Sequence, residues 1–439
     1  MLPMPGTPAS SWAVYKARLS GIFEGADARV CIAFWLFGLI NNIFYVIILS
    51  AALDLVGPSI PKATVLLASI IPGLATKLVV PYFIDLIPYS SRIFIFAALS
   101  TCGMLIVALS PSRDAGSVAA KVAGIILANI SSGAGEVNFL SLTHFYGPFS
   151  LASWGSGTGG AGLIGASGYA LATTKLGFSV QHTLLASAVI PLIMLISFFM
   201  LLPLGPLRAA SLSNTAYQSV QHIDDDEPYD REAESLLAQH TSSPQNASFI
   251  QRTIHDLQTK LVRARTLVVP YMVPLFLVYA AEYTINQGVT PTLLFPLENT
   301  PFTHFRDFYP TYGAIYQLGV FISRSSLPFI RIRSLYVPSV LQVANLIVLT
   351  IHALWPFIPT VWFVFAVVFW EGLLGGLVYV STFAAIREEV PENEREFSLG
   401  ATTVSDSGGI CLAGVLGVIM ESALCSWQVN HGIQRCRQL

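Results

Sequence analysis

The sequence predicts an all-α, polytopic membrane protein. Three observations lead to this fold class: 54% of the 439 residues are hydrophobic, only 11% are charged, and the mean hydropathy is +0.64. Soluble domains carry about 25% charged residues, so a water-soluble globule of this length could not cover so much apolar area. A lipid bilayer is therefore the expected surrounding of most of the chain.

Apolar stretches of transmembrane length recur along the chain. A helix that crosses a hydrocarbon core about 30 Å thick needs about 20 mostly apolar residues. By this criterion we expect eleven spans, of which the fourth, fifth and eighth are the least apolar. The spans are 30–56, 63–84, 93–110, 119–140, 150–174, 182–204, 266–287, 308–327, 335–354, 357–381 and 398–424.

One long hydrophilic stretch divides the spans into six and five. Residues 205–265 contain the acidic run Asp224–Glu227, followed by many Ser, Gln, Asn and Thr residues, a composition typical of disorder. A long loop between two bundles that flank a cavity is the layout of the major facilitator architecture. We therefore expect an N-terminal segment (1–29), a six-helix bundle (30–204), a disordered cytosolic loop (205–265), a five-helix bundle (266–424) and a tail (425–439).

The charge distribution predicts that the N-terminus and the long loop lie in the cytosol. The connection between the eighth and ninth spans carries Arg324, Arg331 and Arg333 and no acid, whereas the connection between the ninth and tenth spans has no charge. Positively charged loops stay on the cytosolic side of a membrane. An odd number of spans then puts the C-terminus in the lumen.

Glycines are concentrated in the fifth span. Gly157–Gly162 satisfies the pattern G-x-G-x-x-G of dinucleotide-binding proteins, but that motif requires a preceding strand, and here it opens a membrane span. Close helix packing by small residues spaced four apart, such as Gly155 and Gly159, is the interpretation that we favour. Similar small-residue runs at 155–168 and 405–417 indicate a weak internal repeat between the two bundles.

Several functional classes lack support in the sequence. No nucleophile–base pair stands out, so we expect no enzyme, no cofactor and no metal site. A net charge of −2 without a basic stripe gives no sign of a nucleic-acid partner. The spacing of the five cysteines suggests neither a disulfide framework nor a zinc site. They are Cys31, Cys102, Cys411, Cys425 and Cys436.

Ionisable side chains within the spans are the main functional signal. A charge in hydrocarbon costs at least about 2.5–3.5 kcal/mol, so such residues usually face a cavity or a partner. Four acids and one base fall inside expected spans: Glu136, Glu282, Glu371, Asp406 and Lys77. Three of the acids lie on spans four, seven and ten, which line the cavity of a two-bundle transporter.

Polar neighbours accompany these charges at helical spacing. Glu282 and Asn286 share one face of the seventh span, with Tyr279 one turn earlier. Asn41 and Asn42 lie in the middle of the first span. The functional hypothesis is a polar cavity whose carboxyl groups bind and release protons. The alternative is that each acid is a structural hydrogen-bonding group between helices.

Two short motifs concern trafficking. Glu232, Leu236 and Leu237 match the acidic dileucine pattern E-x-x-x-L-L, which a sorting adaptor would bind in the cytosolic loop. The last four residues, Cys436–Leu439, are similar to a prenylation box. Its middle positions are not aliphatic and the tail is expected in the lumen, so we expect no lipid there.

Several segments resemble one family, the battenins of vacuolar and lysosomal membranes, which include the Batten-disease protein and its fungal relatives. The likeness covers most of the chain outside 1–28 and 205–265. The segments that carry it are Phe34–Asn42, Ala281–Gly288, Gly319–Ser326, Glu371–Gly376 and Ser405–Asp406.

The resemblance implies a major-facilitator-like fold in the vacuolar or lysosomal membrane, and importance for Glu282, Arg324, Glu371 and Asp406. Fungal members are linked to vacuolar pH homeostasis and arginine transport, and animal members to glycerophosphodiester export. The excess of buried acids favours proton coupling and a cationic or zwitterionic solute, whereas an anionic solute would need Lys77 or Arg324. We expect a proton-linked secondary transporter; the alternative is a non-transporting scaffold for vacuolar trafficking.

Overall fold

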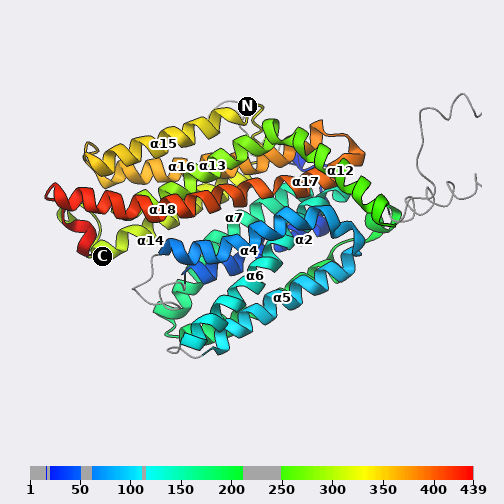
Figure 1. The fold of residues 1–439 in the computed structure, drawn as a ribbon, viewed down its shortest axis with the longest axis horizontal. Helices are drawn as coiled ribbons and strands as arrows, with labels where there is room; N and C mark the ends of the chain where they lie inside the picture. The colour runs from blue at the N-terminus through cyan, green and yellow to red at the C-terminus, as the bar shows by residue number, and fades with distance from the viewer. Residues whose placement is uncertain (1–15, 17–19, 51–61, 111–114, 211–248, 439) are drawn as a thin grey trace, which may run out of the picture.

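The computed structural model describes residues 16, 20–50, 62–110, 115–210 and 249–438. Within these ranges the chain is helical and contains no strand. Most helices run side by side along the long axis of the molecule (Figure 1). The helices are α2 (Ala28–Ser50), α4 (Lys62–Phe83), α5 (Tyr89–Leu109), α6 (Ala115–Leu142), α7 (Pro148–Ala170), α8 (Val180–Ser187), α9 (Pro191–Ile196), α12 (Phe249–Leu267), α13 (Val273–Thr284), α14 (Phe308–Ser325), α15 (Tyr336–Leu354), α16 (Val361–Glu389), α17 (Glu392–Thr402) and α18 (Val404–Asn430).

The helices form two halves, which we call the N-terminal half (α2 to α9) and the C-terminal half (α12 to α18). In the N-terminal half α2 packs on α7, and α6 packs on α4 and α5. In the C-terminal half α14 packs on α16, and α13 packs on α18. The halves meet where α7 contacts α14 and where α4 contacts α18, helices that lie far apart in the sequence (Figure 1).

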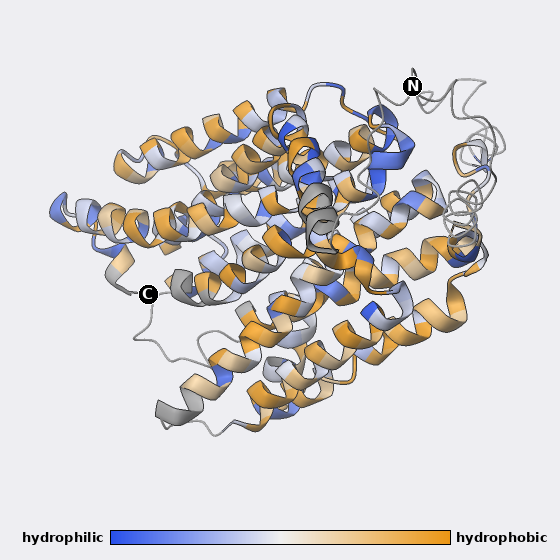
Figure 2. Cartoon of the chain, turned by 45° about the vertical axis from the view of Figure 1, so that its right-hand side comes forward, coloured by the Kyte–Doolittle hydropathy of each residue, from blue (hydrophilic) through white to orange (hydrophobic). Residues whose placement is uncertain are grey.

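The outer faces of the helices are apolar. Leu78 and Val79 of α4 and Val337 and Val340 of α15 are each more than half exposed, and hydrophobic residues follow the outer helices in Figure 2. Apolar patches of this extent are typical of a surface that lipid covers. Nine helical stretches of the described ranges are long and apolar enough to cross a membrane. The all-α, polytopic fold class is therefore confirmed.

Two of the expected spans are not among these nine stretches. The ranges 150–174 and 308–327 are helical, as α7 and α14, but they are less apolar, as their Gly and Tyr residues indicate. Both helices lie at the contact between the halves, where α7 packs against α2 on one side and α14 on the other. Burial against other helices replaces lipid around them, so they need fewer apolar side chains.

Several expected spans break or change helix type. The fifth ends in a π-helical turn, η4 (Leu171–Lys175). The sixth is broken into α8 and α9 where Pro191, which has no backbone N–H, begins the second helix. The seventh consists of α13 between two π-helical turns, η6 (Val268–Met272) and η7 (Ile285–Val289). The eleventh is broken at Thr403 between α17 and α18, and nothing in the local sequence explains that break.

The expectation of disorder throughout 205–265 is wrong at both ends, because 205–210 are helical and 249–265 form most of α12. Leu261 and Val262 of this helix are exposed, whereas its polar side chains contact other helices. Lys260 Nζ lies 3.1 Å from Asp85 Oδ2, and Arg263 Nε lies 3.2 Å from Glu394 Oε1. Ion pairs with residues of both halves thus hold a segment too polar to bury. The sorting motif at Glu232, Leu236 and Leu237 lies outside the described residues.

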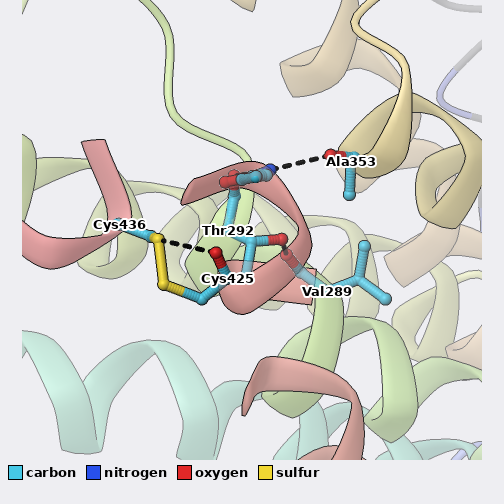
Figure 3. Close-up of a disulfide and its surroundings, with 6 residues drawn as sticks. Val289, Thr292, Ala353, Cys425 and Cys436 are labelled. Carbon is cyan, nitrogen blue, oxygen red and sulfur yellow. Dashed lines mark hydrogen bonds between the residues drawn. A yellow bond between two sulfur atoms is a disulfide. The ribbon is translucent and has the colours of Figure 1, made fainter. Parts of the chain in front are cut away.

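The expectation of no disulfide is also wrong, because Cys425 and Cys436 are bonded to each other (Figure 3). They are eleven positions apart in the sequence, and the chain reverses after α18 at Gly432, whose φ of +87° favours glycine. The end of α18 is also held by Gln428, whose amide donates to the carbonyl oxygens of Thr292 and Ala353. Cys436 therefore has no free thiol for a lipid.

Close backbone contacts explain the glycines of α7. A Cβ atom at Gly157 would collide with the carbonyl oxygen of Trp35 in α2, and one at Gly38 would collide with that of Trp154. On another side of α7, a Cβ at Gly159 would lie 3.0 Å from Cα of Phe321 in α14. The glycine run thus brings three helices together, which confirms the helix-packing interpretation.

This packing makes Gly157→Ala a sharp test. We expect the added methyl group to lower stability by about 1–3 kcal/mol, because α2 and α7 must move apart. Gly168→Ala is the matched control, since a Cβ there has nothing within 4 Å. Thermal unfolding of the purified variants in detergent measures both, and equal transition temperatures would contradict the close contact.

Candidate functional site

A polar cavity of about 820 Å³, its open mouth included, lies between the two halves. Helices α2, α4, α6 and α7 line it from the N-terminal half, and α13, α14, α16 and α18 line it from the C-terminal half. Six of the expected site residues belong to the lining: Asn42, Lys77, Glu136, Tyr279, Arg324 and Asp406. Side chains from both halves thus surround one shared space.

The ammonium group of Lys77 binds two carboxylates in the cavity wall. Its Nζ lies 2.7 Å from Glu136 Oε2 and 3.0 Å from Asp406 Oδ1. All three side chains are less than 11% exposed. Lys77 and Glu136 belong to the N-terminal half and Asp406 to the C-terminal half, so this ion-pair cluster joins the halves across the cavity.

Hydrogen bonds extend the cluster on both sides. Tyr379 of α16 donates its hydroxyl to Glu136 Oε1 at 2.8 Å and accepts a hydrogen bond from the indole of Trp154. Asp406 lies in the first turn of α18, where its Oδ1 accepts the backbone N–H of Ser407 at 2.6 Å. A helix N-terminus stabilises a carboxylate. Each acid therefore has neutral donors in addition to Lys77.

Arg324, the second cation of the cavity, has a different environment. Its Nη1 donates to the hydroxyl of Thr158 and its Nη2 to that of Tyr279, both at 2.7 Å. Its guanidinium carbon lies 4.2 Å from the ring centre of Tyr379. In the described part of the chain no carboxylate pairs with it within 4 Å, and its Nε has no hydrogen-bond partner. The positive charge is thus held without a neutralising acid.

The position of Arg324 differs from the one that the loop-charge count assumed. The sequence counts it among the arginines of a short connection, but it lies in the last turn of α14 and its guanidinium lines the cavity. Only Arg331 and Arg333 remain in the connection. A glycine neighbour allows this placement, because Gly376 of α16 leaves room for the side-chain stem of Arg324.

Four expected site residues lie outside the cavity lining. Asn41 binds α6 instead: its Nδ2 donates to the carbonyl oxygen of Ser132 at 3.0 Å. Glu282 accepts a hydrogen bond from the hydroxyl of Tyr316, and Glu371 accepts one from Asn286 Nδ2 at 3.1 Å. Glu282, Asn286 and Glu371 thus form a second polar cluster inside the C-terminal half.

Tyrosines are the residues that the sequence interpretation missed. Besides Tyr279, the cavity is lined by Tyr45, Tyr283, Tyr316 and Tyr379. Tyr279 and Tyr283 are one helical turn apart and their rings stack at 6.0 Å. A search for hydroxyl groups at helical spacing within the spans would have found this pair.

Two helical halves around a central polar cavity define the class of protein: a membrane protein with the major facilitator fold. The solved structure of the proton:xylose symporter XylE, bound to 6-bromo-6-deoxy-D-glucose, superposes with a TM-score of 0.56 at 14% sequence identity. The match covers 96% of this chain and 92% of that chain. This likeness establishes the fold.

Sequence comparison then gives the family. Residues 32–427 match the CLN3 protein family. Protein btn1 of Aspergillus fumigatus is 58% identical and the match covers 100% of this chain and 97% of the relative. Protein BTN1 of Yarrowia lipolytica is 48% identical over 92% of this chain and 96% of the relative. The chain belongs to the CLN3 protein family, which confirms the battenin resemblance.

The ion-pair cluster predicts an unequal response to single and combined substitutions. We expect Lys77→Met to destabilise the protein by about 3–5 kcal/mol, because Glu136 and Asp406 stay buried without their cation. Combining it with Glu136→Gln and Asp406→Asn removes the unpaired charges and should restore most of the loss. Thermal unfolding in detergent is the measurement, with the exposed Lys175→Met as control. A triple variant no more stable than Lys77→Met would refute the charge explanation.

Proposed function

We propose that the protein is a secondary transporter of the vacuolar (lysosomal) membrane that moves a small solute through the central cavity by alternating access. The observation that supports this most is a polar cavity whose charged walls come from both halves. A rocking motion of the halves would open such a space to one side of the membrane at a time. Proton linkage and a role in vacuolar pH homeostasis belong to the same proposal.

The charges of the cavity favour a solute that carries an anionic group. Four charged side chains line it, and Lys77 already neutralises Glu136 and Asp406, whereas Arg324 pairs with no carboxylate of the described residues. A guanidinium with free donors is suited to a phosphodiester or a carboxylate. A glycerophosphodiester would present the first group to Arg324, and a basic amino acid such as arginine the second.

This preference differs from the cationic solute that the excess of acids suggested. That inference counted four intramembrane acids, but Glu282 and Glu371 do not line the cavity. The two acids that do line it share one ammonium group. An amino acid remains compatible, because its carboxylate would meet Arg324 while its amino group would lie near the acids.

The proposed orientation has the N-terminus in the cytosol and the C-terminus in the lumen. The disulfide Cys425–Cys436 supports it independently of loop charge, because cytosolic thiols are kept reduced and disulfides persist in oxidising compartments. Arg331 and Arg333 then lie on the cytosolic side, as expected for positive loops.

Transport by purified protein in liposomes tests the proposal. We expect uptake of a labelled glycerophosphodiester, and an Arg324→Gln variant should lose about tenfold or more of it, because a charged hydrogen bond is worth about 1.5–3 kcal/mol. Arg324→Lys keeps the charge without the planar fork and should fall between. Arg306→Gln, at an exposed position, is the control.

Arginine uptake, measured in parallel, decides between the two solute classes. If wild-type protein moves neither solute with or without a pH gradient, the transport proposal fails and the scaffold alternative gains. Deletion of 215–250 then tests the scaffold: it should abolish the cellular function of a scaffold and leave that of a correctly delivered transporter intact.

Labelling of cysteines in intact vacuoles tests the orientation. In a variant whose other three cysteines are replaced by serine, Cys425 and Cys436 should react with an impermeant maleimide only after reduction and permeabilisation, because they are bonded and face the lumen. A Ser242→Cys control in the long loop should react without permeabilisation. Labelling of Cys436 in intact vacuoles would contradict the proposed side.

A further inference from the structure

Two carboxyl groups lie behind the cavity wall, inside the C-terminal half. The exposed fractions of Glu282 and Glu371 are 1% and 0%. In the described part of the chain neither carboxylate has a Lys or Arg nitrogen within 4.0 Å. Oε2 of each is buried and has no hydrogen-bond partner. This pair therefore differs from Glu136 and Asp406, which share Lys77.

The energetics of such a pair favour the protonated state. An ionised carboxylate without a cation in a low-dielectric interior costs several kcal/mol, and two of them within electrostatic range of each other cost more. A protonated carboxyl group is neutral and gains an O–H donor. A proton on Oε2 of each residue would thus remove the cost of burying these oxygens.

The surroundings offer one cation and several hydroxyl groups. On the cavity-facing sides of the helices around the pair lie Tyr279 and Tyr283 of α13, Tyr316 and Arg324 of α14, Tyr379 of α16 and Asp406 of α18. Glu421 of α18 interacts with Tyr309. Helix α15 carries only Tyr336 and His352, whose hydrogen bonds go to backbone atoms near its ends. Among the described residues, Arg324 is therefore the cation that interacts electrostatically with Glu282.

Tyr316 connects this pair with the cavity. Its hydroxyl donates to Glu282 Oε1, and its side chain belongs to the cavity lining. A proton can pass when the hydroxyl proton moves to the Glu282 carboxylate while the phenolic oxygen takes a proton from a hydronium ion in the cavity, which becomes water. The net change is one proton transferred from the cavity to Glu282, with Tyr316 unchanged.

We propose that Glu282 and Glu371 form a proton-binding site separate from the solute cavity, loaded through Tyr316, and that its occupancy sets the affinity of Arg324 for an anion. The inference rests on the proposed transport function. When Glu282 is ionised, its charge offsets that of Arg324 and weakens anion binding. When a proton neutralises Glu282, Arg324 is free to bind the anionic group of the solute, so proton and solute bind cooperatively.

Liposomes separate coupling from solute movement. One assay drives accumulation of labelled glycerophosphocholine with a pH gradient, and the other measures exchange of labelled for unlabelled solute at equal pH, which needs no net proton movement. We expect Glu282→Gln and Glu371→Gln to lower gradient-driven accumulation roughly tenfold or more, while exchange stays within about twofold of wild type. Tyr316→Phe should slow gradient-driven accumulation, because it removes the hydroxyl that donates to Glu282.

Glu298→Gln, which neutralises an exposed acid, is the matched control and should change neither assay. Normal accumulation in both Gln variants would overturn the proton site and leave transport standing. Loss of exchange together with accumulation, at an unchanged transition temperature, would also overturn it, because the pair would then act on the solute. If wild-type protein shows no exchange and no accumulation, the transport proposal fails first.

Discussion

The free-energy cost of burying an ionised side chain away from water determines how the polar interior of this protein is arranged. Lys77 meets that cost by contacting two carboxylates at once, and these contacts join α4 and α6 of one half to α18 of the other. Removing either half from this arrangement would leave a buried charge without its partner. In the proposed cycle the halves can separate at this point only if water or a solute replaces the lost contact, so the ion pairs make opening dependent on the contents of the cavity.

The desolvation cost of the buried Arg324 guanidinium is offset differently, by neutral groups. Neutral hydroxyls of Thr158 and Tyr279 and the ring of Tyr379 solvate its guanidinium, which leaves the charge itself uncompensated. Such contacts attract and solvate a cation but do not neutralise its charge. The glycines of α7 are part of this arrangement, because Gly159 lies against the stem of Arg324 and lets α7 bring Thr158 within reach. The close packing of α7 and the position of the Arg324 guanidinium therefore depend on one another.

The fold could be predicted from the sequence because it depends on properties that each segment shows by itself. Apolar length, rare charge and one long polar loop are visible without knowing which helices touch, and the glycine run indicates close contact without naming the partner. The faces of the helices are a harder problem. Asn41 and Asn42 are adjacent in sequence, yet a rotation of about 100° separates them, so one binds α6 and the other lines the cavity. Knowing that both residues lie in the first span does not predict which of them faces the cavity.

The sequence did not indicate that Glu282 and Glu371 lie outside the cavity lining, nor that the disulfide forms, for a related reason. Glu282 and Glu371 lie on the expected helices, but only the packing of α16 against both α13 and α14 decides that Tyr316 stands between Glu282 and the cavity. Cys425 and Cys436 meet because the chain reverses at Gly432, and their spacing carries no signal of that turn. Contacts that depend on tertiary packing are not encoded in any one segment.

Both acid clusters coincide with irregular helices, and this coincidence has a physical basis. The break at Thr403 puts Asp406 in the first turn of α18, where the N–H of Ser407 is free to bind its carboxylate. The π-helical turn η7 inserts an extra residue after α13 and directs Asn286 toward Glu371. A regular helix uses its N–H groups internally and presents none to an acid. Irregular backbone within membrane depth is tolerated where polar groups of the protein satisfy it, so these two interruptions are positions where a carboxyl group can be held, charged or protonated, inside the bilayer.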